Sequence, residues 1–238
     1  MEQIYTIPVN EAFDDSRDNP SSGCPICTLF RRLEEDELQL ILGASMMEPD
    51  IRVQTNRLGF CDGHFSRMQK RKNRLGMALM LESHLDEARA RIFPSGLAAL
   101  VSKTGGLSAL EEIESSCYIC KRVEFHLANM ISTVILLWES DFSFREKFAA
   151  QGHFCLPHYR RLLAYADKRM SKKDKAAFHR VAESIELAYY DSLREDIKEF
   201  CRSFDYRYEG EPSPESKTAV DRAVRFLSGR EGREIKPC

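Results

Sequence analysis

The chain has 238 residues, of which 43% are hydrophobic and 30% are charged. A chain of this length and composition can bury enough apolar surface for one compact domain or two small ones, which excludes an intrinsically disordered protein. The net charge is −2, from 35 basic and 37 acidic residues, and argues against a protein whose main partner is a polyanion.

The N-terminal region gives no sign of export or membrane insertion. Residues 1–15 lack the basic and then apolar pattern of a signal peptide, and no later stretch approaches the roughly 18 apolar residues of a membrane span. We therefore expect a cytoplasmic protein with no membrane partner. The segment 3–13 (QIYTIPVNEAF) is rich in β-branched and aromatic residues and is interrupted by Pro8, so we predict an extended strap there.

The first half then shows a series of helical patterns. Apolar residues recur with helical spacing over 25–42, while the acidic residues 34–37 are expected on the solvent-facing side. A short helix is predicted over 48–57, ended by Gly59. A further helix is predicted to start after His64, marked by Phe65 and Met68, and another covers 75–92. Pro94 and the pair Gly105 and Gly106 mark a junction, followed by a short helix over 108–115.

The second half repeats this order. A long helix is predicted from Cys117 to Trp138, a short one over 140–150, and another after His158. A long apolar seam predicts a helix over 173–204, and a turn rich in aromatic residues leads to a last helix over 216–227.

Two tetrads of metal-type ligands lie on these helices, each written as CxxC followed by CxxH. The paired elements are separated by 33 residues in the first copy and by 34 in the second. The eight predicted metal ligands are Cys24, Cys27, Cys61 and His64 in the first copy, and Cys117, Cys120, Cys155 and His158 in the second.

Each CxxC and each CxxH is expected at a helix N-terminus, where unpaired backbone N–H groups and the positive helix dipole favour thiolates. Three thiolates and one imidazole are a ligand set for tetrahedral Zn²⁺, and four protein ligands leave no open position for a substrate. The sequence therefore predicts two structural zinc ions. An iron–sulfur cluster fits the same ligands, whereas a dithiol redox centre would require a βαβ context that is missing.

The pairing of the elements is open to two arrangements. The simpler one, which we predict, joins the CxxC of each copy to its own CxxH. The alternative joins the CxxC of one copy to the CxxH of the other.

Other polar residues have weaker patterns. Cys201 is expected as a small buried side chain and Cys238 as a free thiol on a loose terminus, while His153 is expected to pack in a loop or to support the metal site indirectly. The basic run 67–74 is typical of a solvated helix face, with nucleic-acid binding as the alternative. No phosphate loop, nucleophile elbow or dinucleotide motif indicates an enzyme.

The segments IYTIPVNEAF, CPIC, GFCDGH, HFCLPH and FDYRYEGEP, considered together, resemble an uncharacterised bacterial family of unknown function that carries duplicated motifs of this kind. The resemblance extends over roughly residues 3–229 and implies a cytoplasmic bacterial protein with paired cysteine and histidine clusters. It implies no activity, substrate or partner. The second motif, Cys117-Tyr-Ile-Cys120, departs from the Cys-Pro opening of the first.

We therefore predict an all-α protein in which two duplicated three-helix units, each with a Cys3His zinc site, pack with a long C-terminal helix and a helical extension. The predicted divisions are 1–93, a connector 94–116, a second repeat 117–170, and the C-terminal part 171–238. The function favoured is a zinc-binding structural or interaction protein. The aromatic residues of the turn 204–212 either dock the last helix on the core or form a partner surface. A thiol-based redox or metal-stress sensor is the alternative.

Overall fold

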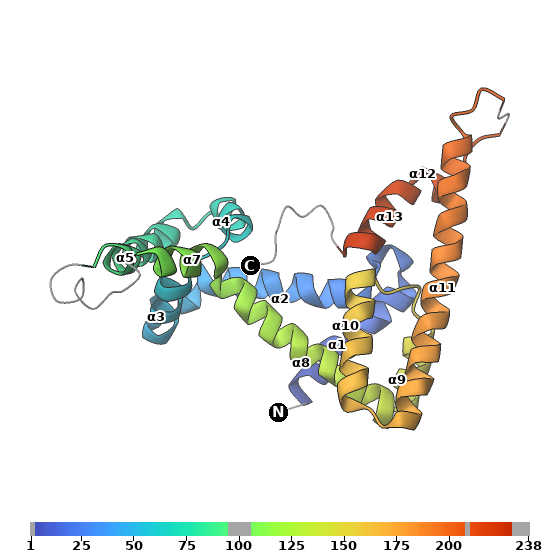
Figure 1. Ribbon diagram of the computed structural model, residues 1–238, viewed down its shortest axis with the longest axis horizontal. Coiled ribbons are helices and arrows are strands. Elements are labelled where there is room, and N and C mark those ends of the chain that lie inside the picture. Colours follow the sequence, from blue (N-terminus) through green and yellow to red (C-terminus); the bar gives the residue numbers. More distant parts are fainter. Residues whose placement is uncertain (1–2, 95–105, 208–209, 230–238) are drawn as a thin grey trace. The chain divides into compact units, whose positions relative to one another are not determined.

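The computed structural model describes residues 3–94, 106–207 and 210–229, and all regular structure in these ranges is helical (Figure 1). The all-α prediction is confirmed. The α-helices are α1 (Gln3–Asp18), α2 (Pro25–Ile41), α3 (Pro49–Leu58), α4 (Asp62–Gln69), α5 (Arg74–Ile92), α7 (Leu107–Ser115), α8 (Tyr118–Ser140), α9 (Phe142–Ala149), α10 (Leu156–Arg169), α11 (Lys172–Arg202), α12 (Pro214–Lys217) and α13 (Ala219–Ser228).

The first helix corrects the prediction of an extended N-terminal strap. Pro8 lies inside α1, where it removes one backbone hydrogen bond at a cost of about 3 kcal/mol. The helix forms nevertheless because Val9, Ala12, Phe13 and Ser16, which share one helical face, are all buried. Burial of this face outweighs the local preference of the proline.

The described residues divide into two compact units. The first unit comprises residues 3–31 and 127–229, and the second comprises residues 32–94 and 106–126. The boundaries fall inside the long helices α2 and α8, so each helix has one end in each unit. The compact units therefore do not coincide with the predicted repeats 1–93 and 117–170.

The first unit has an aromatic core. The ring of Phe13 on α1 lies 5.1 Å from that of Phe144 on α9, and the ring of Phe148 lies 5.0 Å from those of Phe154 and Phe178. These side chains are fully buried. They join α1, α9 and α11 with the loop that precedes α10, so the start of α10 is held on the core (Figure 1).

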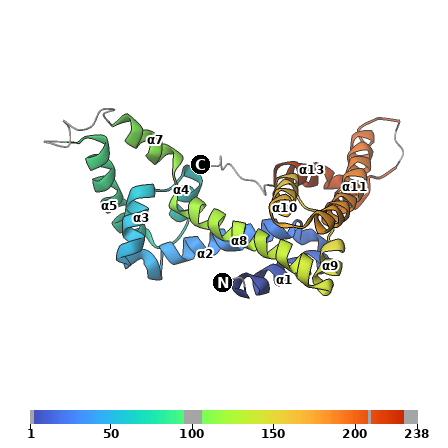
Figure 2. The ribbon, with the colours of Figure 1, turned by 60° about the horizontal axis from the view of Figure 1, so that its bottom comes forward.

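The second unit is built on contacts among α3, α5 and α7, which lie together in Figure 2. Gly59 ends α3 with a φ of 59°, a conformation that favours glycine. Its carbonyl oxygen accepts a hydrogen bond of 3.0 Å from the amide of Tyr118, the first residue of α8. This bond brings the start of α8 next to the segment that carries Cys61.

Three features of the surface bear on the sequence predictions. Cys201 is exposed, which contradicts the prediction of a buried side chain, while Cys238 lies outside the described residues. Phe204 and Tyr206 are 76% and 94% exposed, so neither docks the last helix on the core. In the described part of the chain, no helix combines the length and apolar character needed to cross a membrane.

Candidate metal centres

The structure gathers all eight predicted ligands into two tetrads, but it pairs them across the copies. Site 1 consists of Cys24, Cys27, Cys155 and His158, and site 2 consists of Cys61, His64, Cys117 and Cys120. Within each tetrad the ligand atoms all lie within 4.8 Å of one another. The predicted pairing of each CxxC with its own CxxH is therefore wrong, and the crossed alternative is the one observed.

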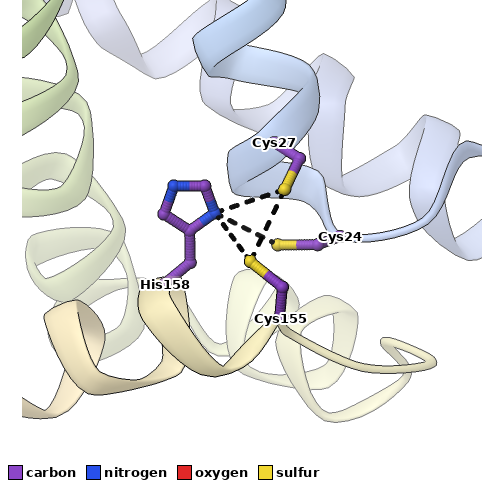
Figure 3. A group of neighbouring side chains, drawn as sticks. All are labelled: Cys24, Cys27, Cys155 and His158. Carbon is purple, nitrogen blue, oxygen red and sulfur yellow. Dashed lines mark hydrogen bonds between the residues drawn. The ribbon is translucent and has the colours of Figure 1, made fainter. Parts of the chain in front are cut away.

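Site 1 lies entirely within the first unit (Figure 3). Nδ1 of His158 is 3.1 Å from Sγ of Cys155, 3.4 Å from Sγ of Cys27 and 3.7 Å from Sγ of Cys24. The sulfurs of Cys27 and Cys155 are 3.5 Å apart. Figure 3 shows all four ligand atoms directed toward one point between the start of α2 and the start of α10.

Site 2 lies entirely within the second unit and has the same composition. Nδ1 of His64 is 3.1 Å from Sγ of Cys61, 3.3 Å from Sγ of Cys117 and 3.5 Å from Sγ of Cys120. The sulfurs of Cys61 and Cys120 are 3.8 Å apart. The two sites thus have closely similar internal geometry.

These separations, 3.1 to 3.8 Å, are close to those around a single tetrahedral ion. Sulfur bonded at about 2.3 Å and nitrogen at about 2.0 to 2.1 Å place neighbouring ligand atoms about 3.5 to 3.8 Å apart. An iron–sulfur cluster spreads its four ligands over two or four iron atoms, so some of the ligand atoms lie farther apart than they do around one ion. The residues therefore fit one metal ion per tetrad.

The length of the helices explains the crossed pairing. Cys24 and Cys27 lie at the N-terminal end of α2. The 17 residues of α2 carry the backbone about 25 Å along the helix axis before the chain turns toward Cys61 and His64. The second copy has the same order, with 23 residues in α8 between Cys117 and the following helices. In each copy the long helix therefore separates the CxxC from its own CxxH.

Both tetrads are formed at pairs of helix N-termini, as predicted. Cys155 and Cys61 are the residues directly before α10 and α4, and Cys24 and Cys117 directly precede α2 and α8. The amide of Cys120 donates a hydrogen bond of 3.5 Å to a ligand sulfur, Sγ of Cys117. The positive ends of two helix dipoles favour the negative charge of the thiolates at each site.

The thiols of site 1 differ in acidity. Burial raises the pKa of Cys24, but hydrogen bonds with Cys155, Cys27 and His158 outweigh burial and hold this pKa well below its usual range. The hydrogen bond with Cys155 raises the pKa of Cys27, and the hydrogen bond with Cys24 raises that of Cys155. A metal ion entering the site must therefore displace the protons of Cys27 and Cys155.

Site 2 follows the same pattern. Hydrogen bonds with Cys117 and Cys120 lower the pKa of Cys61, whereas the hydrogen bond with Cys117 raises that of Cys120. Burial alone would lower the pKa of His64, but hydrogen bonds with Cys117, Cys61 and Glu34 raise it to about 11. Metal binding therefore also releases protons here.

The environment of site 2 includes a carboxylate that the sequence analysis assigned to the solvent. Oε1 of Glu34 lies 3.2 Å from Nε2 of His64, the nitrogen on the opposite side of the ring from the sulfurs. Nη1 of Arg67 lies 2.5 Å from Oε2 of the same glutamate. Glu34 and Glu37 are buried, which corrects the prediction of a solvent-facing position for these two residues, whereas Glu35 and Asp36 are exposed as predicted. A carboxylate at this position orients a metal-binding imidazole and increases its basicity.

A helical pattern in the sequence could have revealed these buried glutamates. Glu34, Glu37, Leu38 and Ile41 have the spacing of one helix face, and all four are buried. The sequence analysis assigned the glutamates to the solvent-facing side because they are charged, so it did not identify this face as buried. The acidic residues of α2 also account for part of the basic run 67–74. Arg67 contacts Glu34 and Arg71 contacts Glu35, so two arginines of this run form ion pairs with α2.

Site 1 is bordered by different groups. Oε1 of Glu186 on α11 accepts a hydrogen bond of 2.6 Å from the amide of Phe154, the residue before Cys155. The carbonyl oxygen of Gly229 lies 3.8 Å from Sγ of Cys27. His153 belongs to neither tetrad, and its ring stacks on that of Tyr189 with 4.0 Å between the ring centroids.

Gly229 is constrained by site 1 in two ways. Its φ is 66°, and a Cβ atom at this position would lie 3.0 Å from Sγ of Cys155 and 3.3 Å from Pro157. The C-terminal end of α13 can therefore approach the site only because this residue has no side chain. The sequence analysis missed Gly229 and Glu186, since nothing in the local pattern places them near the cysteines.

The arrangement can hold a metal ion, and its chemistry is that of a closed site. Three sulfurs and one nitrogen fill the four positions of a tetrahedral ion, so no position is left for a substrate or a reactive water molecule. Each ion would connect two helix N-termini that are far apart in the sequence. The residues present therefore fit structural metal binding.

The comparisons with known proteins place the chain in a family. Neither the curated proteins nor the solved structures include a significant match. The family model described as "Family of unknown function (DUF6062)" matches residues 1–234. This match, over nearly the whole chain that carries the two tetrads, shows that the protein belongs to the DUF6062 family.

Proposed function

We propose that the protein is a zinc-binding structural protein in which two Cys3His sites hold together helices from distant parts of the chain. The observation that carries this proposal is the geometry of the tetrads, whose four ligand atoms all lie within 4.8 Å of one another, close enough to bind one tetrahedral ion. Sulfur-rich sites of this kind bind Zn²⁺ tightly, and the fully protein-coordinated ion contributes to folding rather than to catalysis. The use of thiolates as ligands fits a reducing compartment, the cytoplasm.

The electrostatics support zinc with three thiolates. Such a site carries a formal charge of −1, from one Zn²⁺ and three sulfur anions with a neutral histidine. The two helix N-termini at each site stabilise that charge. At site 2, the ion pair of Glu34 with Arg67 adds no net charge while it orients His64.

Elemental analysis and chelation test the proposal. Protein purified without oxygen should contain two zinc ions per chain, and a strong chelator should remove them with a loss of helical circular dichroism. Iron with visible absorbance, or metal-free protein with the same helicity and stability, would contradict a structural zinc protein. A metal-free sample refolded with Zn²⁺ serves as the control for reversibility.

A second function, a thiol-based sensor, is favoured by the exposure of part of each site. Cys27, Cys61 and Cys120 are only partly buried. Hydrogen peroxide would oxidise two ligand thiolates to a disulfide, take up two protons from the solvent and be reduced to two water molecules, with release of Zn²⁺. A sensor should release zinc at micromolar peroxide and regain it after reduction, whereas a purely structural site should keep its zinc under those conditions.

The proposal also includes an interaction with a partner protein at the turn that follows α11. The exposed rings of Phe204 and Tyr206, at the C-terminal end of α11, are residue types enriched at protein interfaces. Their exposure supports a contact with a partner protein at this turn.

A further inference from the structure

The hairpin formed by α10 and α11 concentrates positive charge in the first unit. Residues 160–180 contain eight basic and two acidic residues, a net charge of +6, whereas the whole chain has a net charge of −2. The rest of the chain therefore carries −8, a segregation that the net charge of the chain does not reveal. Six of the eight basic side chains are exposed, and we call them the basic hairpin surface: Arg160, Lys168, Arg169, Lys172, Lys173 and Arg180.

The two carboxylates of this segment interact with residues outside the basic hairpin surface. Oδ1 of Asp167 lies 3.6 Å from Nζ of Lys175 and 3.3 Å from Nε2 of His179. Oδ2 of Asp174 accepts a hydrogen bond of 2.7 Å from the hydroxyl group of Ser171. None of the six side chains of the surface forms an ion pair with a residue that the structure describes. Their charges are therefore available to an anion outside the chain.

Four of the six cations lie at the turn between the two helices. Lys168 and Arg169 belong to the last turn of α10, and Lys172 and Lys173 begin α11. Figure 1 shows this turn at the lower edge of the first unit. The two arginines of the surface lie eight or nine residues further along the helices, about 12 to 14 Å from the turn. The cations thus extend farther than one phosphate group can contact, which favours an extended polyanion.

The electrostatic setting of Lys172 and Lys173 also indicates a role outside the fold. Both lie in the first turn of α11, where the positive end of the helix dipole disfavours cations, so their charge does not stabilise the helix. After Asp174, the next carboxylate along α11 is that of Glu183, about 15 Å from Lys173 along the helix axis. This distance exceeds the Debye length of about 8 Å at physiological salt. The acidic second half of α11 therefore does not cancel the attraction of these lysines for an anion.

The other exposed residues of the segment indicate the kind of polyanion. They are Asp167, Ser171 and Ala176, and no aromatic or large apolar side chain of residues 160–180 is exposed. Single-stranded nucleic acid is bound by stacking of its bases on aromatic rings, and amphipathic helices bind membranes by inserting apolar side chains. The phosphate backbone of a duplex requires only cations spaced along its path.

We propose that the basic hairpin surface binds the phosphate backbone of double-stranded nucleic acid without reading its base sequence. Contact by the four cations at the turn gives a slope of about −3 to −4 for the logarithm of the binding constant against the logarithm of the salt concentration. Dissociation constants of about 10⁻⁴ to 10⁻⁶ M are typical of such binding. This surface goes beyond the proposed zinc function, because it contains none of the eight residues of the tetrads.

Fluorescence anisotropy of a labelled DNA duplex, titrated with the metal-bound protein at several salt concentrations, tests this proposal. The double variant Lys172→Gln with Lys173→Gln removes two cations of the surface. It should weaken the affinity about tenfold or more at physiological salt and reduce the steepness of the salt dependence by about two. The matched control, Lys70→Gln with Lys72→Gln, removes the same charge from exposed positions of the basic run 67–74 and should leave both quantities nearly unchanged.

Helicity and metal content are measured for each variant. The first turn of α11 disfavours cations, so the variant of Lys172 and Lys173 should keep both, and its weaker binding is then not a result of unfolding. The proposal is overturned if the duplex shows no salt-dependent binding or if the two double variants lose affinity equally. It is also overturned if single-stranded DNA, or vesicles that contain phosphatidylserine, bind more tightly than the duplex.

Discussion

Paired alanine substitutions distinguish the crossed tetrads from tetrads formed within each copy. Cys24→Ala with Cys155→Ala removes two ligands of site 1 and none of site 2. Cys24→Ala with Cys61→Ala removes one ligand from each site. Both double variants lose two cysteines that belong to CxxC or CxxH motifs, so they differ only in how those cysteines are paired in space.

The crossed arrangement predicts one metal ion per chain for the first double variant and none for the second. Pairing within the copies predicts the reverse, because Cys24 and Cys61 would then share a site. The assay is elemental analysis together with competition against a chromogenic chelator. One ion retained by the variant of Cys24 and Cys61, or none retained by the variant of Cys24 and Cys155, would refute the reasoning.

The size of the effect on folding follows from the position of site 1 in the first unit. Structural zinc binds with an apparent free energy of about 10 to 16 kcal/mol, which is comparable to the whole stability of a domain at about 5 to 15 kcal/mol. Loss of site 1 should therefore unfold much of the first unit, including α10. The second unit should keep its hydrogen-exchange protection, because site 2 lies within it.

Three further predictions concern residues around the sites. Glu34→Gln should lower the metal affinity of site 2 about tenfold to a hundredfold in chelator competition, since it removes the carboxylate that contacts Nε2 of His64. The control Glu35→Gln changes the exposed neighbour and should leave this affinity unchanged. Equal affinities in the two variants would exclude the role assigned to Glu34. Gly229→Ala should lower the free energy of unfolding by about 1 to 2 kcal/mol, because Gly229 has a positive φ and lies close to site 1. In the control Gly152→Ala the added Cβ meets no atom within 4 Å, so the change should be nearly neutral. Similar denaturation midpoints for the two variants would contradict this reasoning. Burial raises the pKa of Glu186 from 4.5 to about 8. Between these pH values the folded state holds a proton that the unfolded state has lost. The contribution of this group to stability therefore falls as the pH rises from 4.5 to about 8, and is constant above. The difference in unfolding free energy between the native protein and Glu186→Gln should therefore change by about 2 kcal/mol between about pH 6.5 and 8. A constant difference over this range would show that burial does not raise the pKa of this carboxyl group.

The helices were predictable because their signals are local. The apolar spacing of α2, α8 and α11 and the glycine at the end of α3 indicate helices whatever the rest of the chain does. The strap predicted at the N-terminus was wrong for the opposite reason. Pro8 is a local signal against a helix, and only burial of Val9 and Phe13 in the aromatic core overrides it.

The residues of the candidate sites were predictable from the sequence, but their grouping into two tetrads was not. Residue type and the xx spacing identify all eight members of the two tetrads, because side chains three residues apart at a helix N-terminus can converge on one ion. The buried Glu34 and the oxygens of Glu186 escaped detection, since a charged residue on a helix is usually solvated and its burial depends on what packs against that helix.

The amino-acid sequence by itself determined that the protein is helical and that its cysteines and histidines form two equivalent ligand sets at helix N-termini. Only the tertiary structure decided which elements come together in one tetrad. The physical reason is that spacing along the chain fixes the two ligands within one helical turn, whereas the meeting of two turns depends on where a long rigid helix carries the backbone. Because α2 and α8 each span from one unit to the other, each CxxC meets the CxxH of the other copy.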